Sequence, residues 1–262
     1  ALIGLAEVVP GVSGGTVALV VGVYQTVISS AAHLSRGLFS MLRGNTPAAR
    51  HEWASVRWAV LIPLGLGMLA GIVVGAATLE PLIDAQPTIV RAVFAGLILA
   101  SLWVPLRLAG SWNARMVLLA LAAALGMFFL AGVPPLEAAE PSLWIVAPAA
   151  AVAVSALVLP GVSGSFLLVV LGLYQPTLAA VNERDVLYLG VFVLGALVGL
   201  ALFVRVIQYL LTAFPGVTLA IMTGLMAGSL RALWPWQGGE RELLMPGVDY
   251  PEVAVATIIA MA

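Results

Sequence analysis

Long apolar runs, separated by short charged or proline-containing breaks, limit most strongly how this chain can fold. The clearest runs cover 58–79, 92–108, 116–133, 186–211, 217–230 and, more briefly, 251–262. A helix of about 20 apolar residues crosses the hydrocarbon core of a bilayer and satisfies its own backbone hydrogen bonds. We therefore expect an all-α polytopic membrane protein. Glycines four residues apart predict close helix packing at 67/71/75, 195/199 and 224/228.

The composition supports this class and excludes others. Of the 262 residues, 62% are hydrophobic and 9% are charged, whereas a soluble domain carries about a quarter charged residues. All 11 basic residues are arginine and the net charge is −1, so there is no basic excess for binding nucleic acid. The absence of cysteine excludes a thiolate metal site and a cysteine nucleophile.

Two further apolar regions, 1–34 and 143–181, are interrupted by proline and glycine at 10–15 and 160–165. Proline removes a helical hydrogen bond and glycine costs about 1 kcal/mol relative to alanine, so each region is predicted to be a broken helix. Backbone opened at membrane depth is tolerated only where it is buried in protein or lines a cavity. The breaks are therefore candidate sites.

The two breaks are copies of one motif. Residues 9–25 read VPGVSGGTVALVVGVYQ and residues 159–175 read LPGVSGSFLLVVLGLYQ, with nine of 17 positions identical at an offset of 150. GLILASL at 96–102 is echoed by GLMAGSL at 224–230, at an offset of 128. Hydrophobic bias alone does not produce PGVSG followed by Tyr-Gln at fixed spacing, so we infer an internal duplication.

We assign residues 1–133 to a first repeat and 143–262 to a second, each with a broken element and about three transmembrane helices. The arginine-rich loop 35–57 and turn 107–115 are cytoplasmic by the positive-inside rule. The acidic loop 134–141 then lies outside. If both broken elements are re-entrant hairpins, they enter from opposite faces, which makes the inverted repeat of many transporters.

Charge counting leaves an alternative topology for the second element. Two hairpins place seven arginines inside (36, 43, 50, 57, 107, 115 and 205) and four outside. A single broken span places nine inside (36, 43, 50, 57, 107, 115, 184, 231 and 241) and two outside. The count mildly favours the single span. We prefer the hairpin because 143–181 has about twice the length that one span needs.

The helix start after each break is a predicted anion site. Unpaired N–H groups and the positive end of the helix dipole attract an anion there, and glycine lets the backbone approach it. Two starts that enter from opposite faces would point at one place near the midplane. The alternative is a simple turn with a serine cap. The predicted binding residues are Ser13, Gly14, Gly15, Thr16, Ser163, Gly164 and Ser165.

Ionisable groups in apolar runs are further candidates because a charge there is costly. Glu7, which is replaced by Leu157 in the second copy, is assigned to ion coupling, with a backbone cap as the alternative. Arg205 is assigned to anion binding because a guanidinium pairs well with phosphate, with snorkelling as the alternative. Tyr24 and Tyr174, about three turns beyond their serines, are predicted to anchor those helices at the membrane interface.

An enzymatic role is not expected. Residues 11–15, GVSGG, match the G-x-S-x-G of serine hydrolases, and the first four letters match the G-x-S-G of rhomboid proteases. A serine nucleophile needs a base within hydrogen-bond reach. The two histidines, His33 and His51, lie in or beside the arginine-rich loop, and none follows. We predict no catalytic residue, metal or cofactor.

The two motifs, in AEVVPGVSGGTVALVVGVYQ and LPGVSGSFLLVVLGLYQ, resemble the PopT family of polyprenyl-phosphate transporters, formerly a domain of unknown function. The resemblance covers nearly the whole chain. It implies a flippase of the bacterial cytoplasmic membrane that returns undecaprenyl phosphate, the lipid carrier of cell-wall peptidoglycan synthesis, to the inner leaflet. The phosphate would bind at 13–16 and 163–165. The family more often has aspartate where Glu7 stands.

These expectations define a mechanism and its competitors. Without a nucleotide-binding motif, we expect alternating access by rocking of the repeats, driven by an ion gradient. The expected partners are a polyprenyl phosphate and the bilayer, without nucleic acid, and a homo-oligomer is left open. The alternative function is a small-anion channel or exchanger with chloride-channel-like inverted repeats. A third is a membrane scaffold or intramembrane enzyme.

Overall fold

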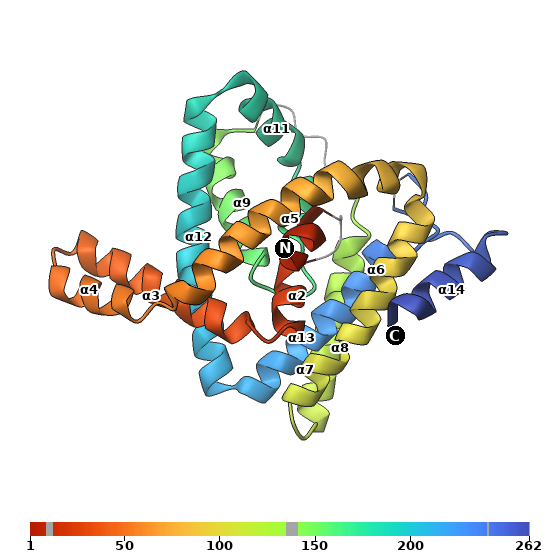
Figure 1. Ribbon diagram of the computed structural model, residues 1–262, viewed down its shortest axis with the longest axis horizontal. Coiled ribbons are helices and arrows are strands. Elements are labelled where there is room, and N and C mark those ends of the chain that lie inside the picture. The colour runs from red at the N-terminus through yellow and green to blue at the C-terminus, as the bar shows by residue number, and fades with distance from the viewer. Residues whose placement is uncertain (9–12, 135–140, 240, 262) are drawn as a thin grey trace.

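The predicted all-α polytopic class is confirmed. A computed structural model describes residues 1–8, 13–134, 141–239 and 241–261, and within these ranges the chain forms helices and no strand (Figure 1). Within the described residues, five helices are long and apolar enough to cross a membrane, or as many as seven if each of two bent pairs is one span. Most of the predicted outer loop 134–141, and residues 9–12 of the first motif, lie outside the described residues.

Most of the helices follow one another with short connections. The first half contains α1 (Leu2–Val8), α2 (Gly14–Val20), α3 (Tyr24–Leu42), α4 (Thr46–Ala54), α5 (Trp58–Ala85), α6 (Pro87–Ser101), α7 (Trp103–Leu108) and α8 (Ala114–Ala131). The second half contains α9 (Leu143–Ala156), α10 (Gly164–Val170), α11 (Tyr174–Glu183), α12 (Val186–Ala213), α13 (Pro215–Ser229), the 3₁₀ helix η1 (Leu230–Leu233) and α14 (Tyr250–Met261).

Each copied motif forms a sharply bent pair of helices. The bend is 119° between α2 and α3 and 102° between α10 and α11. A glycine in the left-handed region stands at each bend, Gly22 with φ +76° and Gly172 with φ +71°, a conformation that glycine adopts without steric cost. Tyr24 and Tyr174 therefore begin new helices. The prediction that they continue the helix starting at Ser13 or Ser163 is wrong.

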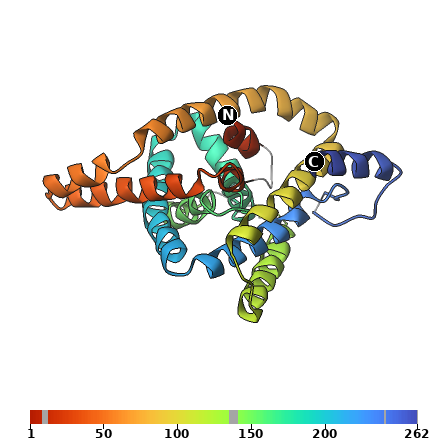
Figure 2. The ribbon, with the colours of Figure 1, turned by 60° about the horizontal axis from the view of Figure 1, so that its bottom comes forward.

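Helix boundaries recur at the offsets seen in the sequence. The helices α5 and α12 both have 28 residues and start at Trp58 and Val186, which are 128 positions apart. The helices α2 and α10 both have seven residues and start 150 positions apart. The offset of 150 is larger than the offset of 128 because the first half has more residues between its bend and its 28-residue helix: α3 is longer than α11, and α4 is additional. These two helices project from the body in both views (Figures 1 and 2).

Corresponding glycines join corresponding helix pairs. Gly71 of α5 contacts α1 and Gly199 of α12 contacts α9, with no room for a Cβ atom at either position. Gly96 of α6 contacts α14 and Gly224 of α13 contacts α8, again without space for a Cβ. The predicted packing role of these glycines is confirmed. The last helix of each half packs against the other half, whereas the inverted relation of the halves stays a prediction.

Candidate functional site

The two copied motifs touch each other in the fold. The hydroxyl of Ser13, at the start of α2, donates to the Leu159 carbonyl over 3.1 Å. The hydroxyl oxygen of Thr16 accepts from the Gly161 N–H over 2.9 Å. Ser13 and Thr16 are 1% and 2% exposed, so both side chains are buried. The side chains of the first motif thereby hold the backbone of the second.

Tyr24 makes a third bond, to the residue directly before the second motif. It is 3% exposed, and its hydroxyl donates to the Val158 carbonyl over 2.7 Å. The prediction that Tyr24 anchors a helix at the membrane interface is therefore wrong. Tyr24 is instead a structural residue of the junction, which sequence reasoning missed. Its position two residues after the positive-φ Gly22 is the signal that a new helix, with a new direction, begins there.

The start of α2 is already occupied by a carboxylate of the protein. The Gly14 N–H donates to Glu7 Oε1 over 2.9 Å, and the Gly15 N–H donates to the Ser13 hydroxyl over 3.2 Å. A Cβ atom added to Gly14 would overlap the Glu7 carboxylate. Negative charge is favourable at this end of a helix. Of the two interpretations of Glu7, the backbone cap is the contact that the structure contains.

The start of α10 lacks such a carboxylate. Leu157 stands where Glu7 stands in the first motif, and its side chain lies against Gly164. The Ser163 hydroxyl shares a 2.9 Å hydrogen bond with the Ser165 hydroxyl and caps the Phe166 N–H over 3.5 Å. Among the described residues, no acceptor is bound to the N–H groups of Gly164 and Ser165. In the first motif the N–H groups of Gly14 and Gly15 are bound to acceptors, whereas the corresponding N–H groups of Gly164 and Ser165 have none among the described residues.

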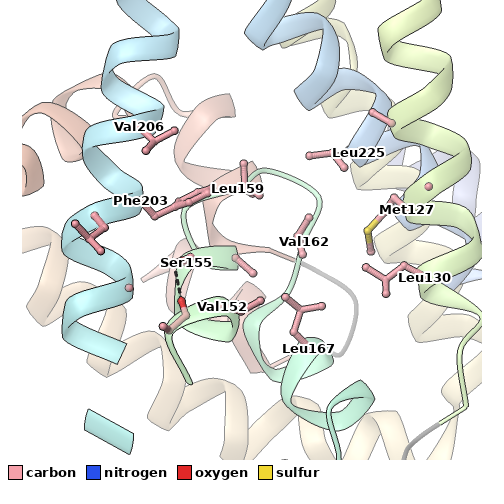
Figure 3. A pocket seen from close by; sticks show the side chains of 16 residues that line it. Met127, Leu130, Val152, Ser155, Leu159, Val162, Leu167, Phe203, Val206 and Leu225 are labelled. Carbon is pink, nitrogen blue, oxygen red and sulfur yellow. Dashed lines mark hydrogen bonds between the residues drawn. The ribbon is translucent and has the colours of Figure 1, made fainter. Parts of the chain in front are cut away.

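An apolar groove of about 590 Å³ lies beside the second motif. Figure 3 shows side chains of α12 facing those of α8 and α13 across the turn of the motif. The single hydroxyl among the residues that line the groove belongs to Ser155, and it donates to the Ala151 carbonyl of the same helix. Val152 and Val206 are 56% and 50% exposed, so the groove reaches the outer surface. The labelled lining residues include Met127, Leu130, Leu159, Val162, Phe203 and Leu225.

Arg205 lies in a separate pocket. Its guanidinium carbon is 4.3 Å from the centre of the Phe39 ring, and its Nε is buried without a partner in the described chain. The pocket has about 320 Å³ and includes Arg36, which donates to Gln208 over 2.9 Å. None of the predicted motif residues lines it. The structure thus brings Glu7 to the first motif and leaves Arg205 apart from both.

Two more arginines share a third pocket. Arg91 of α6 and Arg241, in the segment between η1 and α14, line a space of about 280 Å³ together with Phe166 of α10. Neither is among the predicted binding residues. A single arginine at the start of an apolar run, such as Arg91, is typical of a topology anchor. No cluster of metal-binding side chains occurs among the residues that the structure describes.

Comparison with known proteins gives concordant matches. A family model described as undecaprenyl phosphate translocase-like matches residues 3–245. The chain is 35% identical over 236 residues to a polyprenyl-phosphate transporter of Vibrio cholerae, covering 89% of this chain and 75% of that protein. It is 37% identical over 87 residues to a polyprenyl-phosphate transporter of Staphylococcus aureus, covering 31% of each. Both relatives are named as transporters, not enzymes. No solved structure matches significantly.

Proposed function

The chain belongs to the undecaprenyl phosphate translocase-like family, and from this premise we propose that it moves undecaprenyl phosphate across the bacterial cytoplasmic membrane. The observation that carries the proposal is the junction of the two motifs beside an apolar groove. A polyprenyl phosphate has an anionic head and a long hydrocarbon tail. Hydroxyl and N–H donors next to an apolar wall match that combination.

The head and the tail meet at Leu159. Its carbonyl accepts from Ser13 in the junction, and its side chain lines the groove. On this proposal the phosphate binds the donors of Ser163, Gly164 and Ser165, while the tail lies along α8, α9 and α12. A charged head crosses hydrocarbon slowly because leaving water is costly, so a flippase has to provide polar groups at this depth. Net movement toward the inner leaflet recycles the carrier for cell-wall synthesis.

We propose that both broken elements are re-entrant hairpins entering from opposite faces. The shared pockets support this topology. Arg36 and Arg205 line one pocket, and Arg91 and Arg241 line another. Two hairpins place the first pair inside and the second pair outside. A single broken span for the second motif separates the members of both pairs across the membrane, which their common pockets disfavour.

Cysteine labelling tests the topology, since the described chain contains no native cysteine. Asn182→Cys lies near the end of α11 and Thr46→Cys lies at the start of α4, both exposed. With two hairpins, a membrane-impermeant maleimide labels position 182 from outside and position 46 only from inside. Labelling of both positions from inside alone would establish the single broken span.

We propose that Glu7 couples transport to protons. Its carboxylate holds the Gly14 N–H, a donor that a phosphate at the first motif would need. Two anions repel each other at one helix start, so a phosphate reaches it when Glu7 is protonated or moves away. We therefore expect Glu7→Gln to transport without dependence on external pH, whereas wild-type transport changes with pH. An unchanged pH profile in the variant would assign coupling elsewhere.

Binding of undecaprenyl phosphate to the purified protein tests the proposed substrate. Gly126 lines the groove, and a Cβ atom added there meets no atom within 4 Å, so we use Gly126→Leu to reduce the space in the groove. Gly190 of α12 also has open space but lies outside the groove, which makes Gly190→Leu a matched control. We expect saturable binding in wild type and Gly190→Leu, and affinity at least about tenfold weaker, about 1.4 kcal/mol, in Gly126→Leu.

Two control ligands separate this function from the small-anion channel. Undecaprenol has the tail without the phosphate, and inorganic phosphate has the head without the tail. We expect both to bind more weakly than the complete lipid. Equal binding of inorganic phosphate and undecaprenyl phosphate, with no effect of Gly126→Leu, would contradict a lipid transporter and favour the channel.

A further inference from the structure

We propose that Arg91 and Arg241 form a second phosphate-binding site, on the outer side, which receives the head group before it reaches the motifs. The inference rests on the proposed function and its two-hairpin topology. The two arginines line one pocket although they are 150 positions apart in the sequence. The ligand class is a phosphate monoester or free inorganic phosphate.

Each guanidinium makes one hydrogen bond to a carbonyl of the described chain and has further N–H donors. Arg91 Nη1 donates to the Pro235 carbonyl over 3.5 Å, and Arg241 Nη1 donates to the Val133 carbonyl over 3.2 Å. A guanidinium has five N–H donors in a planar fork that suits phosphate oxygens. These two bonds therefore orient the side chains without exhausting their capacity to bind an anion.

The described residues supply no carboxylate to neutralise the pair. The ion pairs found among them involve Glu52, in the projecting α4. Glu242 lies near the pocket, but its carboxylate is against Gly238 and forms no ion pair with either arginine. Two cations that line one pocket attract an anion more strongly than either does alone. On this proposal that anion is a phosphate.

The size of the pocket suits a head group alone. About 280 Å³ is the room of roughly nine water molecules at about 30 Å³ each, enough for a hydrated phosphate. A long polyprenyl tail does not fit and has to remain in the bilayer. Gly239, which also lines the pocket, has open space beside it, so its backbone is approachable. The pocket thus selects the charged end of a lipid.

Phe166 connects this pocket to the second motif. The Arg241 guanidinium carbon lies 4.8 Å from the centre of the Phe166 ring, which is part of the pocket wall. The Phe166 N–H donates to the Ser163 hydroxyl. Phe166 therefore contacts Arg241 through its ring and Ser163 through its backbone N–H, so the pocket and the second motif share one residue. On this proposal the phosphate passes from the arginines to the motif donors beside this residue.

The distribution of arginine supports a special role. The positive-inside rule disfavours arginine in outer segments. With two hairpins the four outer arginines are 91, 184, 231 and 241. Arg231 stands close behind the pocket, because its carbonyl accepts from the Gln237 amide that lines it. Arg184, in the exposed turn before α12, belongs to neither the pocket nor the motifs and serves as a control.

Chemical protection tests the site in the unaltered protein. Phenylglyoxal modifies accessible arginines, and mass spectrometry measures the rate at each position. We expect inorganic phosphate or undecaprenyl phosphate to slow modification of Arg91 and Arg241 about tenfold, with no effect at Arg184 and no protection by undecaprenol. Protection by only one phosphate ligand identifies the source of the anion. Equal rates with and without both phosphate ligands would overturn the proposal.

Translocation in proteoliposomes separates this site from the proposed function. For lipid supplied on the outer side, we expect Arg91→Gln with Arg241→Gln to raise KM at least tenfold with little change in kcat. Replacement of both by lysine should stay within about threefold of wild type, and Arg184→Gln should be unchanged. Wild-type kinetics in the double glutamine variant refute the outer site alone. Failure of wild type to translocate refutes the proposed function, whereas the protection experiment still decides the site.

Discussion

The bond between Thr16 and Gly161 predicts a measurable loss of stability when its acceptor is removed. Thr16→Val keeps the shape of the side chain and deletes the oxygen that accepts from the Gly161 N–H. That donor is then buried without a partner, which costs about 1–3 kcal/mol. For a domain of this size, each kcal/mol lowers Tm by roughly 2–4 °C. We therefore expect the Tm of Thr16→Val in detergent to be several degrees lower than that of wild type.

Thr223→Val is the matched control. Thr223 is also buried, but its hydroxyl donates to the Leu219 carbonyl four residues earlier in the same helix. That carbonyl keeps its backbone partner after the substitution, so we expect a shift of less than about 0.5 kcal/mol. Tryptophan fluorescence during heating, with seven tryptophans in the chain, measures both variants. Equal Tm values for the two variants would refute the claim that the motifs are bonded to each other.

Two more predictions follow from the backbone and from the projecting hairpin. Gly161→Ala and Gly22→Ala both place alanine at positive φ, which costs about 1–2 kcal/mol. Only at position 161 does the new Cβ meet the α13 backbone, 2.6 Å from Met226 Cα, so the Tm of Gly161→Ala should be clearly lower than that of Gly22→Ala. Equal Tm values for the two variants would contradict this contact. Partial burial acts to raise the pKa of Glu52, but hydrogen bonds from His33 and Arg36 outweigh it and hold the pKa below its ordinary value of 4.5. The ionised form therefore stabilises the fold above pH 4.5, and this contribution is lost as the pH falls through the lowered pKa. The Tm of Glu52→Gln should consequently fall less steeply with decreasing pH than the Tm of wild type. Parallel slopes of Tm against pH would contradict the role of Glu52.

The positions of the long helices follow from hydropathy. The helix α5 begins at Trp58, as the apolar run indicates, but continues beyond residue 79 to Ala85 through Pro81. Charge and proline made the run appear to end earlier. Polar side chains at the end of a membrane helix remain in the interfacial region, so composition changes there before the backbone does. Hydropathy therefore marks the membrane core better than it marks helix ends.

The junction of the motifs was only partly predictable. Duplication and positive-inside charge indicated that two helix starts approach each other, but not which atoms bond. The spacing between Gly22 and Tyr24, which recurs at Gly172 and Tyr174, is the sequence feature that indicates a second bend. Tyr24 was assigned to the interface because a continuous helix was assumed. Contacts such as Tyr24 to Val158 join residues more than 130 positions apart, beyond the range of local patterns.

The arginine pocket illustrates the same limit. In sequence, Arg91 is a single charge at the end of an apolar run, a pattern typical of a topology anchor. Its neighbour Arg241 comes from the other half of the chain and is brought near by the packing of α6 with α14 and η1. The sequence assigns Arg91 and Arg241 to a side of the membrane for each of the two topologies. Only the fold gives their common pocket.

The most direct test of the account is translocation of a polyprenyl phosphate in proteoliposomes that contain this protein alone. We predict that wild type moves the lipid between leaflets faster than protein-free vesicles do. Ser163→Ala with Ser165→Ala should lose most of this activity while keeping the groove and the fold. A wild-type rate equal to that of empty vesicles, or release of small anions without lipid movement, would contradict the central claim.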